Sequence, residues 1–285
     1  MLNGFINLNK AAGMTSHDAV NFLRKIFQTR KVGHGGTLDP NATGILPIAI
    51  GQATKFIEYL VDSGKTYRAE ILFGVETETG DVTGKIIRQI ENFQMPNFDE
   101  LNAATKNFIG QVEQSPPKFS AIKINGRKAY DLARKEINFE IPRRIVTINQ
   151  FKILRVEENI VTVEVDCEKG TYIRSLAVDF GMSFNFPATI KSLQRIRVGK
   201  FLIDDAVTID ELQLSCEKFL KPIDFCLDFE NFYLPAYRVK AYKNGLPTNI
   251  NAENKLVKVY DGENFLGVGK INGGEIRSEK LFCQT

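Results

Sequence analysis

The chain has 285 residues, of which 43% are apolar and 25% are charged, and its net charge is +3. This composition is typical of soluble globular proteins and excludes the disordered and fibrous classes. No apolar run approaches the roughly 18 residues that a membrane-spanning helix requires, and residues 1–10 show no secretory signal, so we expect a cytoplasmic protein with no membrane partner. The length predicts one large domain, or a large and a small one.

The cysteines and histidines form no recognisable disulfide or metal-binding pattern. The four cysteines are widely spaced and include no Cys-x-x-Cys pair, so we expect reduced thiols. The two histidines, His17 and His34, are not accompanied by further ligands at a zinc spacing. We therefore predict no metal site.

Helical and strand-like patterns are mixed in the first part of the chain. Thr15 and Asp18 have the spacing of a capping box, and apolar residues follow at helical intervals, which predicts a helix. Residues 46–50 form a short apolar run typical of a strand. Residues 52–60 have a helical pattern, and residues 65–73 alternate as a strand does.

The middle of the chain predicts antiparallel pairing. The apolar residues between Phe98 and Phe108 have the spacing of an amphipathic helix. Residues 145–156 and 160–167 alternate on either side of three polar residues, as the strands of a hairpin do. Because a hairpin is present and regular βαβ periodicity is missing, we predict an α+β fold around a mixed or antiparallel sheet.

The C-terminal part has a different pattern. Residues 255–260, 265–268 and 275–277 are short strand-like runs separated by Asp-Gly and Gly-Gly turns. This pattern predicts a small β-rich module that begins near Phe229.

Basic residues are concentrated in two segments. Residues 116–155 contain ten basic and three acidic side chains, and residues 187–200 contain four basic and no acidic ones. Such clusters suit a phosphate backbone, because each neutralised phosphate releases a counterion. Basic side chains also simply solvate protein surfaces, so the clusters alone leave both interpretations open.

A glycine-rich segment, residues 33–44 (GHGGTLDPNATG), is the strongest candidate for a functional loop. Glycine permits positive φ and a close approach to the main chain, and a turn after Asp39 would project its carboxylate. A calcium loop is excluded, because Ile50 stands where the bidentate glutamate of that pattern belongs. An ordinary Asp-Pro turn beside a structural histidine remains the alternative from composition alone.

Six segments in chain order carry a resemblance to a known family: residues 9–16, 33–47, 65–69, 116–123, 169–174 and 193–199. They are similar to the motifs of the TruB family of tRNA pseudouridine-55 synthases, with 33–47 in the place of the catalytic motif. Residues 242–245 and 256–269 resemble the PUA module, a small RNA-binding β-barrel. The resemblance spans nearly the whole chain. Ala11 and Phe119 depart from it, since proline and tyrosine are frequent at those places.

The resemblance implies a fold and a domain division. The expected architecture is the pseudouridine synthase fold, with a mixed, mainly antiparallel sheet flanked by helices and a PUA-like β-barrel at the C-terminus. We expect a catalytic domain over residues 1–228, with an RNA-contacting insertion around 110–145, and a PUA-like module over 229–285. No coiled-coil heptads are visible, so a monomer is expected.

The resemblance also implies an activity. The family isomerises uridine 55 in the T arm of tRNA by breaking the C1'–N1 bond, turning the uracil and rejoining it through C5, without a cofactor. The position matching the central carboxylate is Asp39. It could attack C1', attack the base or remove the 2' proton, and the sequence leaves these three roles open.

Further residues follow from the matched motifs. Arg174 would pair with the carboxylate, Tyr67 would stack on the uracil and help remove the C5 proton, and Leu193 would seal the pocket. Asp81 is expected in the network around Arg174 and Tyr67, and His34 would fill the space left by the flipped base. The remaining predictions place Gly36 and Thr37 at the substrate, and assign the RNA backbone to Lys118, Lys123, Arg127, Arg195 and Arg197.

Two other functions remain as alternatives. A non-catalytic RNA-binding or tRNA-folding protein could use the same surface, although binding alone would not require Asp39, Tyr67 and Arg174 together. A glycosidase is the weaker alternative, because a pair of carboxylates at a fixed separation cannot be identified.

Overall fold

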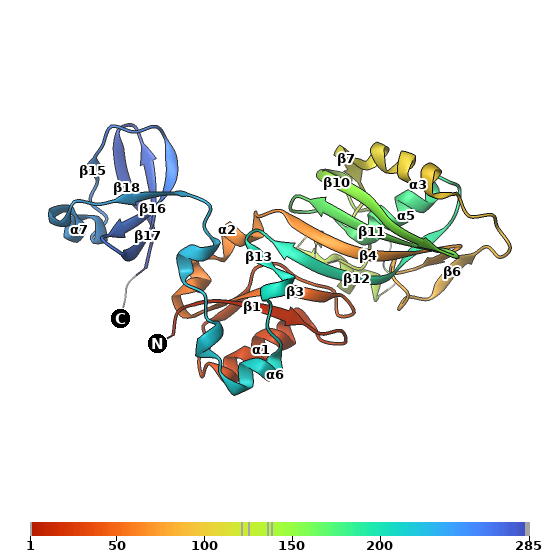
Figure 1. Ribbon diagram of the computed structural model, residues 1–285, viewed down its shortest axis with the longest axis horizontal. Coiled ribbons are helices and arrows are strands. Elements are labelled where there is room, and N and C mark those ends of the chain that lie inside the picture. Colours follow the sequence, from red (N-terminus) through yellow and green to blue (C-terminus); the bar gives the residue numbers. More distant parts are fainter. Residues whose placement is uncertain (1, 121, 125, 136, 138, 283–285) are drawn as a thin grey trace.

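The computed structural model describes residues 2–120, 122–124, 126–135, 137 and 139–282. Its centre is one large sheet (Figure 1). The main path of that sheet runs in the order β1 (Gly4–Lys10), β3 (Thr43–Ile50), β12 (Ala188–Val198), β4 (Lys65–Phe73), β11 (Ile160–Cys167), β10 (Arg144–Glu157) and β7 (Gly110–Gln114). β2 (Val32–His34) pairs with β3, and β13 (Phe201–Leu202) pairs with β12. The described pairs within this sheet are antiparallel except β3–β12, which confirms the prediction of a mixed, mainly antiparallel sheet.

Local sequence signals place most of these elements. The strand predicted at 65–73 is β4, and the predicted hairpin is β10 and β11, joined by a turn in which Glu158 has a φ of 51°. The predicted capping box is present at the start of α1 (Ser16–Ile26), where the side chain of Thr15 accepts from the Asp18 amide and the Asp18 carboxylate accepts from the Thr15 amide. The helical pattern at 52–60 becomes a 3₁₀ turn, Gly51–Phe56, followed by the short helix α2 (Ile57–Val61).

Two groups of helices pack on the large sheet, one near strands β1 and β2 and one on strands β10, β12 and β4. α1 and α6 (Ile209–Leu214) pack near β1 and β2, while α3 (Phe98–Thr105) packs on β10 and α5 (Ile173–Met182) on β12 and β4 (Figure 1). Under α3 and α5, aromatic rings meet edge to face or tilted, which is the favoured geometry for such pairs. The rings belong to Phe73, Phe108, Phe151, Phe180 and Phe184.

The single parallel pairing, between β3 and β12, brings the glycine-rich segment against a distant strand. Gly44 pairs with Arg195, and its φ of 96° suits glycine. A Cβ on Gly44 would clash with the carbonyl oxygen of Arg195. Here it is strand β12 of the protein itself that approaches the glycine closely, and this contact fixes where the loop before β3 ends.

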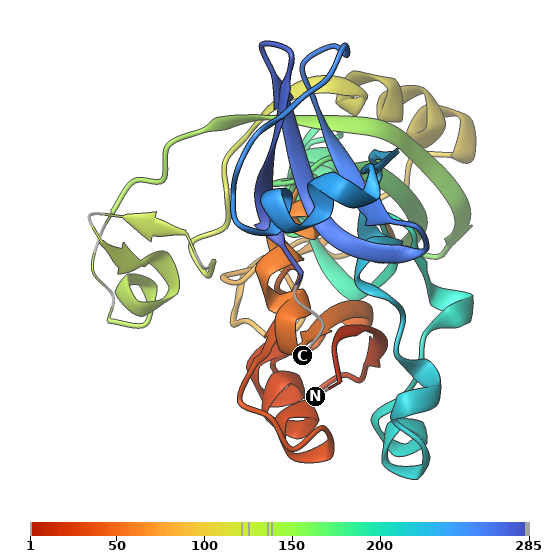
Figure 2. The same cartoon turned by 90° about the vertical axis from the view of Figure 1, so that its left-hand side faces the viewer.

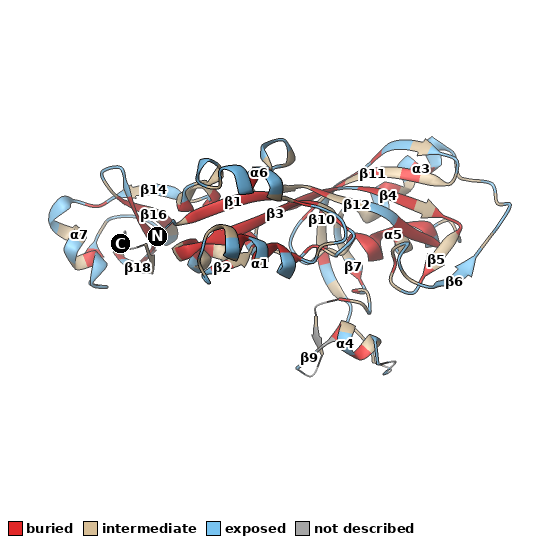
Figure 3. Cartoon of the chain, turned by 90° about the horizontal axis from the view of Figure 1, so that it is seen from below, coloured by how far each residue is buried: buried red, intermediate tan, exposed pale blue. Residues whose placement is uncertain are grey.

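Between β7 and β10 the chain leaves the sheet and forms a small projection. It contains β8 (Lys123–Ile124), β9 (Arg127–Lys128) and α4 (Ala129–Ala133), and it stands away from the body of the molecule (Figures 2 and 3). A second short hairpin, β5 (Val75–Thr77) and β6 (Ile86–Gln89), extends from the end of β4. None of the described helices combines the length and the apolar composition needed to cross a bilayer.

The C-terminal residues form a second, curled sheet. Its strand order is β14 (Glu230–Tyr233), β16 (Lys255–Asp261), β17 (Asn264–Asn272), β18 (Glu275–Leu281) and β15 (Thr248–Asn249), and α7 (Ala236–Lys243) lies beside it. The second sheet begins at Glu230, next to the predicted boundary near Phe229. This architecture is consistent with the expected PUA-like module.

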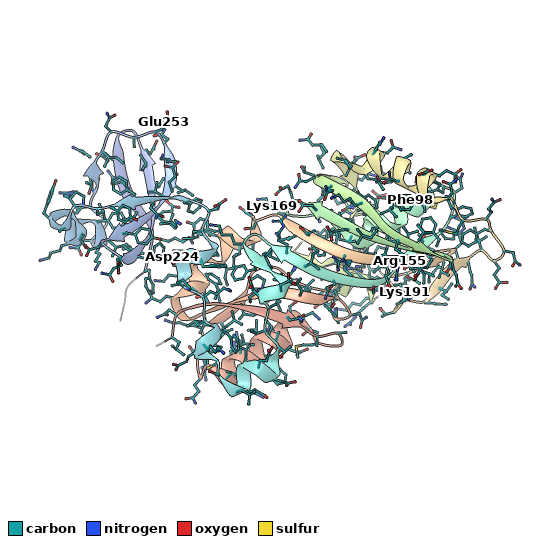
Figure 4. All side chains as sticks on the ribbon, viewed as in Figure 1. Phe98, Arg155, Lys169, Lys191, Asp224 and Glu253 are labelled. Carbon is teal, nitrogen blue, oxygen red and sulfur yellow. The ribbon has the colours of Figure 1, made fainter. Side chains whose placement is uncertain are left out.

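The curled sheet is packed firmly against the rest of the chain. The ring of Phe265 lies 5.9 Å from that of Phe56, and both belong to one buried apolar cluster. The hydroxyl of Tyr260 donates a 2.6 Å hydrogen bond to Asp224, which lies at the junction of the two parts (Figure 4). The two sheets therefore share a core rather than being joined by a bare linker.

The cysteines carry no structural bridge in the described part of the chain. Cys167, Cys216 and Cys226 are free thiols, and Cys283 lies outside the described residues.

Candidate active site

Asp39 lies in the loop between β2 and β3, and this loop is held from the start of α1. The hydroxyl of Ser16 accepts a 2.9 Å hydrogen bond from the amide of Leu38 and donates one of 3.1 Å to its carbonyl. The amide of Gly13 donates to the carbonyl of Pro40 at 3.0 Å. The residues on both sides of Asp39 are thus fixed by segments that belong to the first predicted motif.

Lys10 is a buried support of this loop that the sequence analysis did not single out. Its side chain is 0% exposed at the end of β1, and its Nζ donates to the carbonyls of Ala11, Met14 and Pro40 at 2.8, 2.8 and 3.0 Å. Burial lowers the pKa of Lys10 to about 8, against the opposing effect of the Asp39 charge. Lysines are usually exposed, so no residue pattern predicts this arrangement.

Arg174 holds the Asp39 carboxylate through both oxygens, as the resemblance implied. Its Nε lies 2.9 Å from Oδ2, and its Nη2 lies 3.3 Å from Oδ1. Arg174 is on the first turn of α5 and its side chain is only 6% exposed, whereas that of Asp39 is 39% exposed. A bidentate pair of this kind fixes geometry as well as charge. The carboxylate is therefore oriented yet still reachable from outside.

The pKa of Asp39 is raised above its usual value, although its neighbours act in opposite directions. Burial raises it, and the nearby Asp81 carboxylate raises it further, while Arg174 and Lys10 lower it. Asp81 lies in the turn after β5, where its carboxylate accepts hydrogen bonds from the side chains of Thr79 and Thr83. Asp81 thus acts on Asp39 through its charge.

A small pocket opens beside this pair. Asp39, Asp81, Arg174 and Leu193 contribute to its wall, in agreement with their prediction as neighbours. Its other lining residues are Asn41, Ala42, Val82, Thr83, Ile190, Lys191 and Ser192. Lys191 stands on β12 at the rim, with 45% of its side chain exposed (Figure 4). The pocket combines two carboxylates, two cations and an apolar side.

Tyr67 is buried on β4, with 8% of the residue exposed, and its neighbour across the strand pair is Arg195. Burial raises the pKa of Tyr67, and the charge of Arg195 opposes the rise. The charge of Asp39 adds to the rise. Tyr67 therefore lies beneath the surface, within electrostatic range of Asp39.

The prediction that Arg195 contacts the RNA backbone is wrong. Arg195 is 1% exposed, and its guanidinium donates to the carbonyls of Ile45, Thr37 and Gly36 at 2.8, 3.3 and 3.0 Å. The predicted substrate residues Gly36 and Thr37 therefore turn their carbonyl groups inward, although the Thr37 residue itself is exposed. A buried guanidinium with these partners is not available to a phosphate.

Arg197, which was also predicted to contact RNA, is partly exposed and makes its described contacts within the protein. Its guanidinium forms an ion pair with Asp166 and donates to the hydroxyl of Thr66 at 2.9 Å. The pairing of β12 with β4 contains a bulge at this point, so that Arg195 faces Tyr67 and Arg197 faces Thr66. Because Thr66 and Tyr67 are consecutive, the two arginines point to opposite faces of the sheet.

The other residues predicted to contact RNA have fewer described contacts. His34 ends β2, and burial, followed by the charges of Arg195 and His17, lowers its pKa. Its buried Nδ1 has no hydrogen-bond partner in the described structure. Lys118 and Arg127 are exposed on the projection, and the side chain of Lys123 lies outside what the structure describes.

Comparison with known proteins identifies close relatives. Residues 24–173 match the family described as TruB family pseudouridylate synthase (N terminal domain). A protein named tRNA pseudouridine synthase B from Clostridioides difficile (strain 630) is 38% identical over 99% of this chain and 100% of its own length. The protein of the same name from Alkaliphilus oremlandii (strain OhILAs) is 46% identical over 79% of this chain and 76% of its own.

Solved structures share the fold. A chain in "Structure of H/ACA RNP bound to a substrate RNA containing 2'-deoxyuridine" has a TM-score of 0.75 at 24% identity, over 99% of this chain and 85% of that one. A chain in "Crystal Structure of a Cbf5-Nop10-Gar1 Complex" has the same TM-score at 25% identity, over 98% and 85%. The similarity covers both sheets, since nearly the whole chain superposes.

Proposed function

This chain belongs to the TruB family of pseudouridylate synthases, and on that premise we propose that it converts uridine 55 in the T arm of tRNA to pseudouridine, with Asp39 as the central catalytic group. It is an RNA-modifying isomerase that acts on uridine in tRNA. The observation that carries the specific proposal is the Arg174–Asp39 pair at the wall of a pocket, with Tyr67 beneath it.

The reaction conserves atoms and electrons. The C1'–N1 bond breaks, the uracil turns, and a C1'–C5 bond forms. The proton on C5 is lost and N1 gains one. Because nothing is oxidised or added, the overall change requires no redox or energy cofactor, and we propose that this chain uses no cofactor or metal.

Asp39 has the properties that such a reaction needs. An ionised carboxylate among RNA phosphates is electrostatically disfavoured, and the bidentate pair with Arg174 offsets this. The exposed part of the carboxylate could attack C1', attack the base or remove the 2' proton. In all three roles the ionised form is the active one.

The residues around the pocket have supporting roles in this proposal. Tyr67 provides an aromatic ring and a hydroxyl near Asp39, and Leu193 provides the apolar side. The target uridine is flipped out of the folded arm, which costs a few kcal/mol of unstacking. His34 would stack in the space that the base leaves.

The RNA contacts are assigned to the exposed basic residues and to the C-terminal module. Lys118, Lys123 and Arg127 on the projection would bind the phosphates of the arm. We propose that residues 1–228 are the catalytic domain and 229–285 an RNA-binding module. We propose further that the protein acts on tRNA as a monomer, in the cytoplasm.

Tritium release from tRNA labelled at uracil C5 tests the chemistry and the site together. Wild type should release one equivalent from an unmodified transcript and none when uridine 55 is replaced by cytidine. Asp39→Asn should bind the transcript but release none. The matched control is Asp166→Asn, which alters another Asp–Arg pair on the other face of the sheet and should keep its activity.

Each alternative has its own outcome. Tight, salt-sensitive binding without release by wild type would support the non-catalytic RNA-binding protein. Release that persists after replacement of uridine 55 would show a different target. Normal release by Asp39→Asn would remove Asp39 from the mechanism.

A further inference from the structure

Arg195 connects the main chain on both sides of Asp39. Its Nη2 and Nη1 donate to the carbonyls of Gly36 and Thr37, which precede Asp39, and its Nε donates to that of Ile45, which follows. Arg195 also pairs through its main chain with Gly44. One side chain and its own backbone thereby hold both ends of the catalytic loop.

Arg195 also lies opposite Tyr67, the aromatic residue that the proposed function assigns to the uracil. The two residues are direct partners in the β12–β4 pairing, and the charge of Arg195 opposes the rise that burial causes in the pKa of the phenol. The residue that holds the loop of Asp39 is therefore also the cross-strand neighbour of Tyr67.

Only an arginine can make this set of contacts. Its planar guanidinium has five donors in a fixed fork, whereas a lysine has one ammonium and a glutamine one amide. The hydrogen bonds that the described structure gives the Arg195 side chain go to neutral carbonyls. A charge buried this completely is costly without an ionic partner, so its position adds geometry rather than stability.

We propose that Arg195 is a positioning residue for uridine isomerisation, which holds the Asp39 loop in a fixed place relative to Tyr67 on the neighbouring strand. This inference rests on the proposed function of the same site. It assigns Arg195 an effect on the chemical step and none on RNA binding. A misplacement of about 1 Å is expected to cost on the order of 100-fold in rate.

The test compares Arg195→Lys with wild type in single-turnover tritium release at saturating enzyme. Arg195→Lys keeps the charge and loses the fork, so its rate should fall about 10- to 100-fold. Its Kd for tRNA should stay within about twofold of wild type, with the same dependence on salt. The matched control is Thr66→Val. Thr66 is next to Tyr67 in β4 but on the opposite face of the sheet, where its hydroxyl forms hydrogen bonds with Asp166 and Arg197. Loss of these bonds should leave the rate at the wild-type value.

A double-mutant cycle tests whether Arg195 acts through Tyr67. Tyr67→Phe removes only the hydroxyl of the residue that faces Arg195 across the strand pair. If the two residues act as one unit, the rate of the double variant should be clearly higher than the product of the single effects predicts. Independent, multiplicative losses would contradict the connection to Tyr67.

Three results would overturn the inference. The first is a single-turnover rate for Arg195→Lys within about twofold of wild type, and the second is an equal loss of rate in Thr66→Val. The third is weaker tRNA binding by Arg195→Lys with a reduced dependence on salt, which would show that Arg195 contacts phosphates. If Arg195→Lys does not fold, Arg195→Gln replaces it, and failure of both to fold would assign Arg195 to global folding instead. Absence of release by wild type would overturn the proposed function itself, which separates the two failures.

Discussion

The guanidinium of Arg174 contacts both oxygens of Asp39 and two main-chain carbonyls that come from different parts of the chain. Its Nη1 donates to Thr79 at 2.7 Å and its Nη2 to Phe119 at 2.8 Å. Arg174 thus joins the Asp39 carboxylate to the turn after β5 and to the base of the projection. A ligand that moves the projection would act directly on the partner of Asp39.

The first prediction concerns the pH dependence of the reaction. Burial raises the pKa of Asp39 and Arg174 lowers it, so Arg174→Met should raise it further. Because the ionised form is active, the rate falls as the pH drops through this pKa, and the acid limb should move to higher pH in the variant. Single-turnover rates from pH 4.5 to 8 measure the limb. A limb that stays in place, or moves to lower pH, would contradict this account of Asp39.

The second prediction concerns the buried ammonium of Lys10. Its pKa is about 8 in the folded protein and 10.5 in the unfolded chain, so between these values the unfolded state binds more protons. The contribution of Lys10 to stability should therefore rise as the pH increases through this window. Urea unfolding at pH 7 and 9.5 should show the destabilisation by Lys10→Met growing with pH. A constant difference would show that the pKa of Lys10 is not lowered.

The third prediction concerns the shared core of the two sheets. Phe265 is 9% exposed and packs on Phe56 across the junction, so Phe265→Ala should cost about 3 to 5 kcal/mol. Because the cluster belongs to both parts, wild type should unfold in one transition by calorimetry and by fluorescence. Tyr237→Ala on the exposed side of α7 serves as the control and should be nearly neutral. Separate transitions in wild type would show that the parts unfold independently.

The fourth prediction concerns the projection. Lys118 and Arg127 are exposed there, and the double change Lys118→Ala and Arg127→Ala should weaken tRNA binding and flatten the dependence of log K on log salt. The slope should fall by about one for each lost phosphate contact. Lys25→Ala combined with Lys106→Ala removes two exposed charges elsewhere and should leave the slope unchanged. An unchanged slope in the first pair would exclude those side chains from the phosphate contacts.

Sequence patterns predict the elements of this fold where the signal is local. The alternation at 65–73 matches β4, and Thr15 with Asp18 marks the start of α1. Both depend on residues close together in the chain. The parallel pairing of β3 with β12 joins residues about 150 positions apart, and no local pattern shows it.

The two arginines of β12 show why part of the site could not be predicted. Arg195 and Arg197 were both assigned to RNA because they lie in a segment with four basic and no acidic side chains. A spacing of two in a regular strand would place both on one face, but a bulge in the β12–β4 pairing puts them on opposite faces, and Arg195 is buried. The position of a bulge depends on the partner strand, which the sequence of β12 does not contain. Lys10 was missed for a related reason, since its carbonyl partners belong to two separate loops.

The parallel contact between β3 and β12 also bears on when the molecule becomes active during its synthesis. A nascent chain that ends after β11 already contains Asp39 and Tyr67, but not Arg174 or the strand that meets Gly44. Contacts between residues so distant form late, because the intervening chain must first be ordered. The contacts of Asp39 with Arg174 and of Gly44 with Arg195 therefore form together only when translation has passed β12, so we expect an incomplete chain to be inactive on RNA.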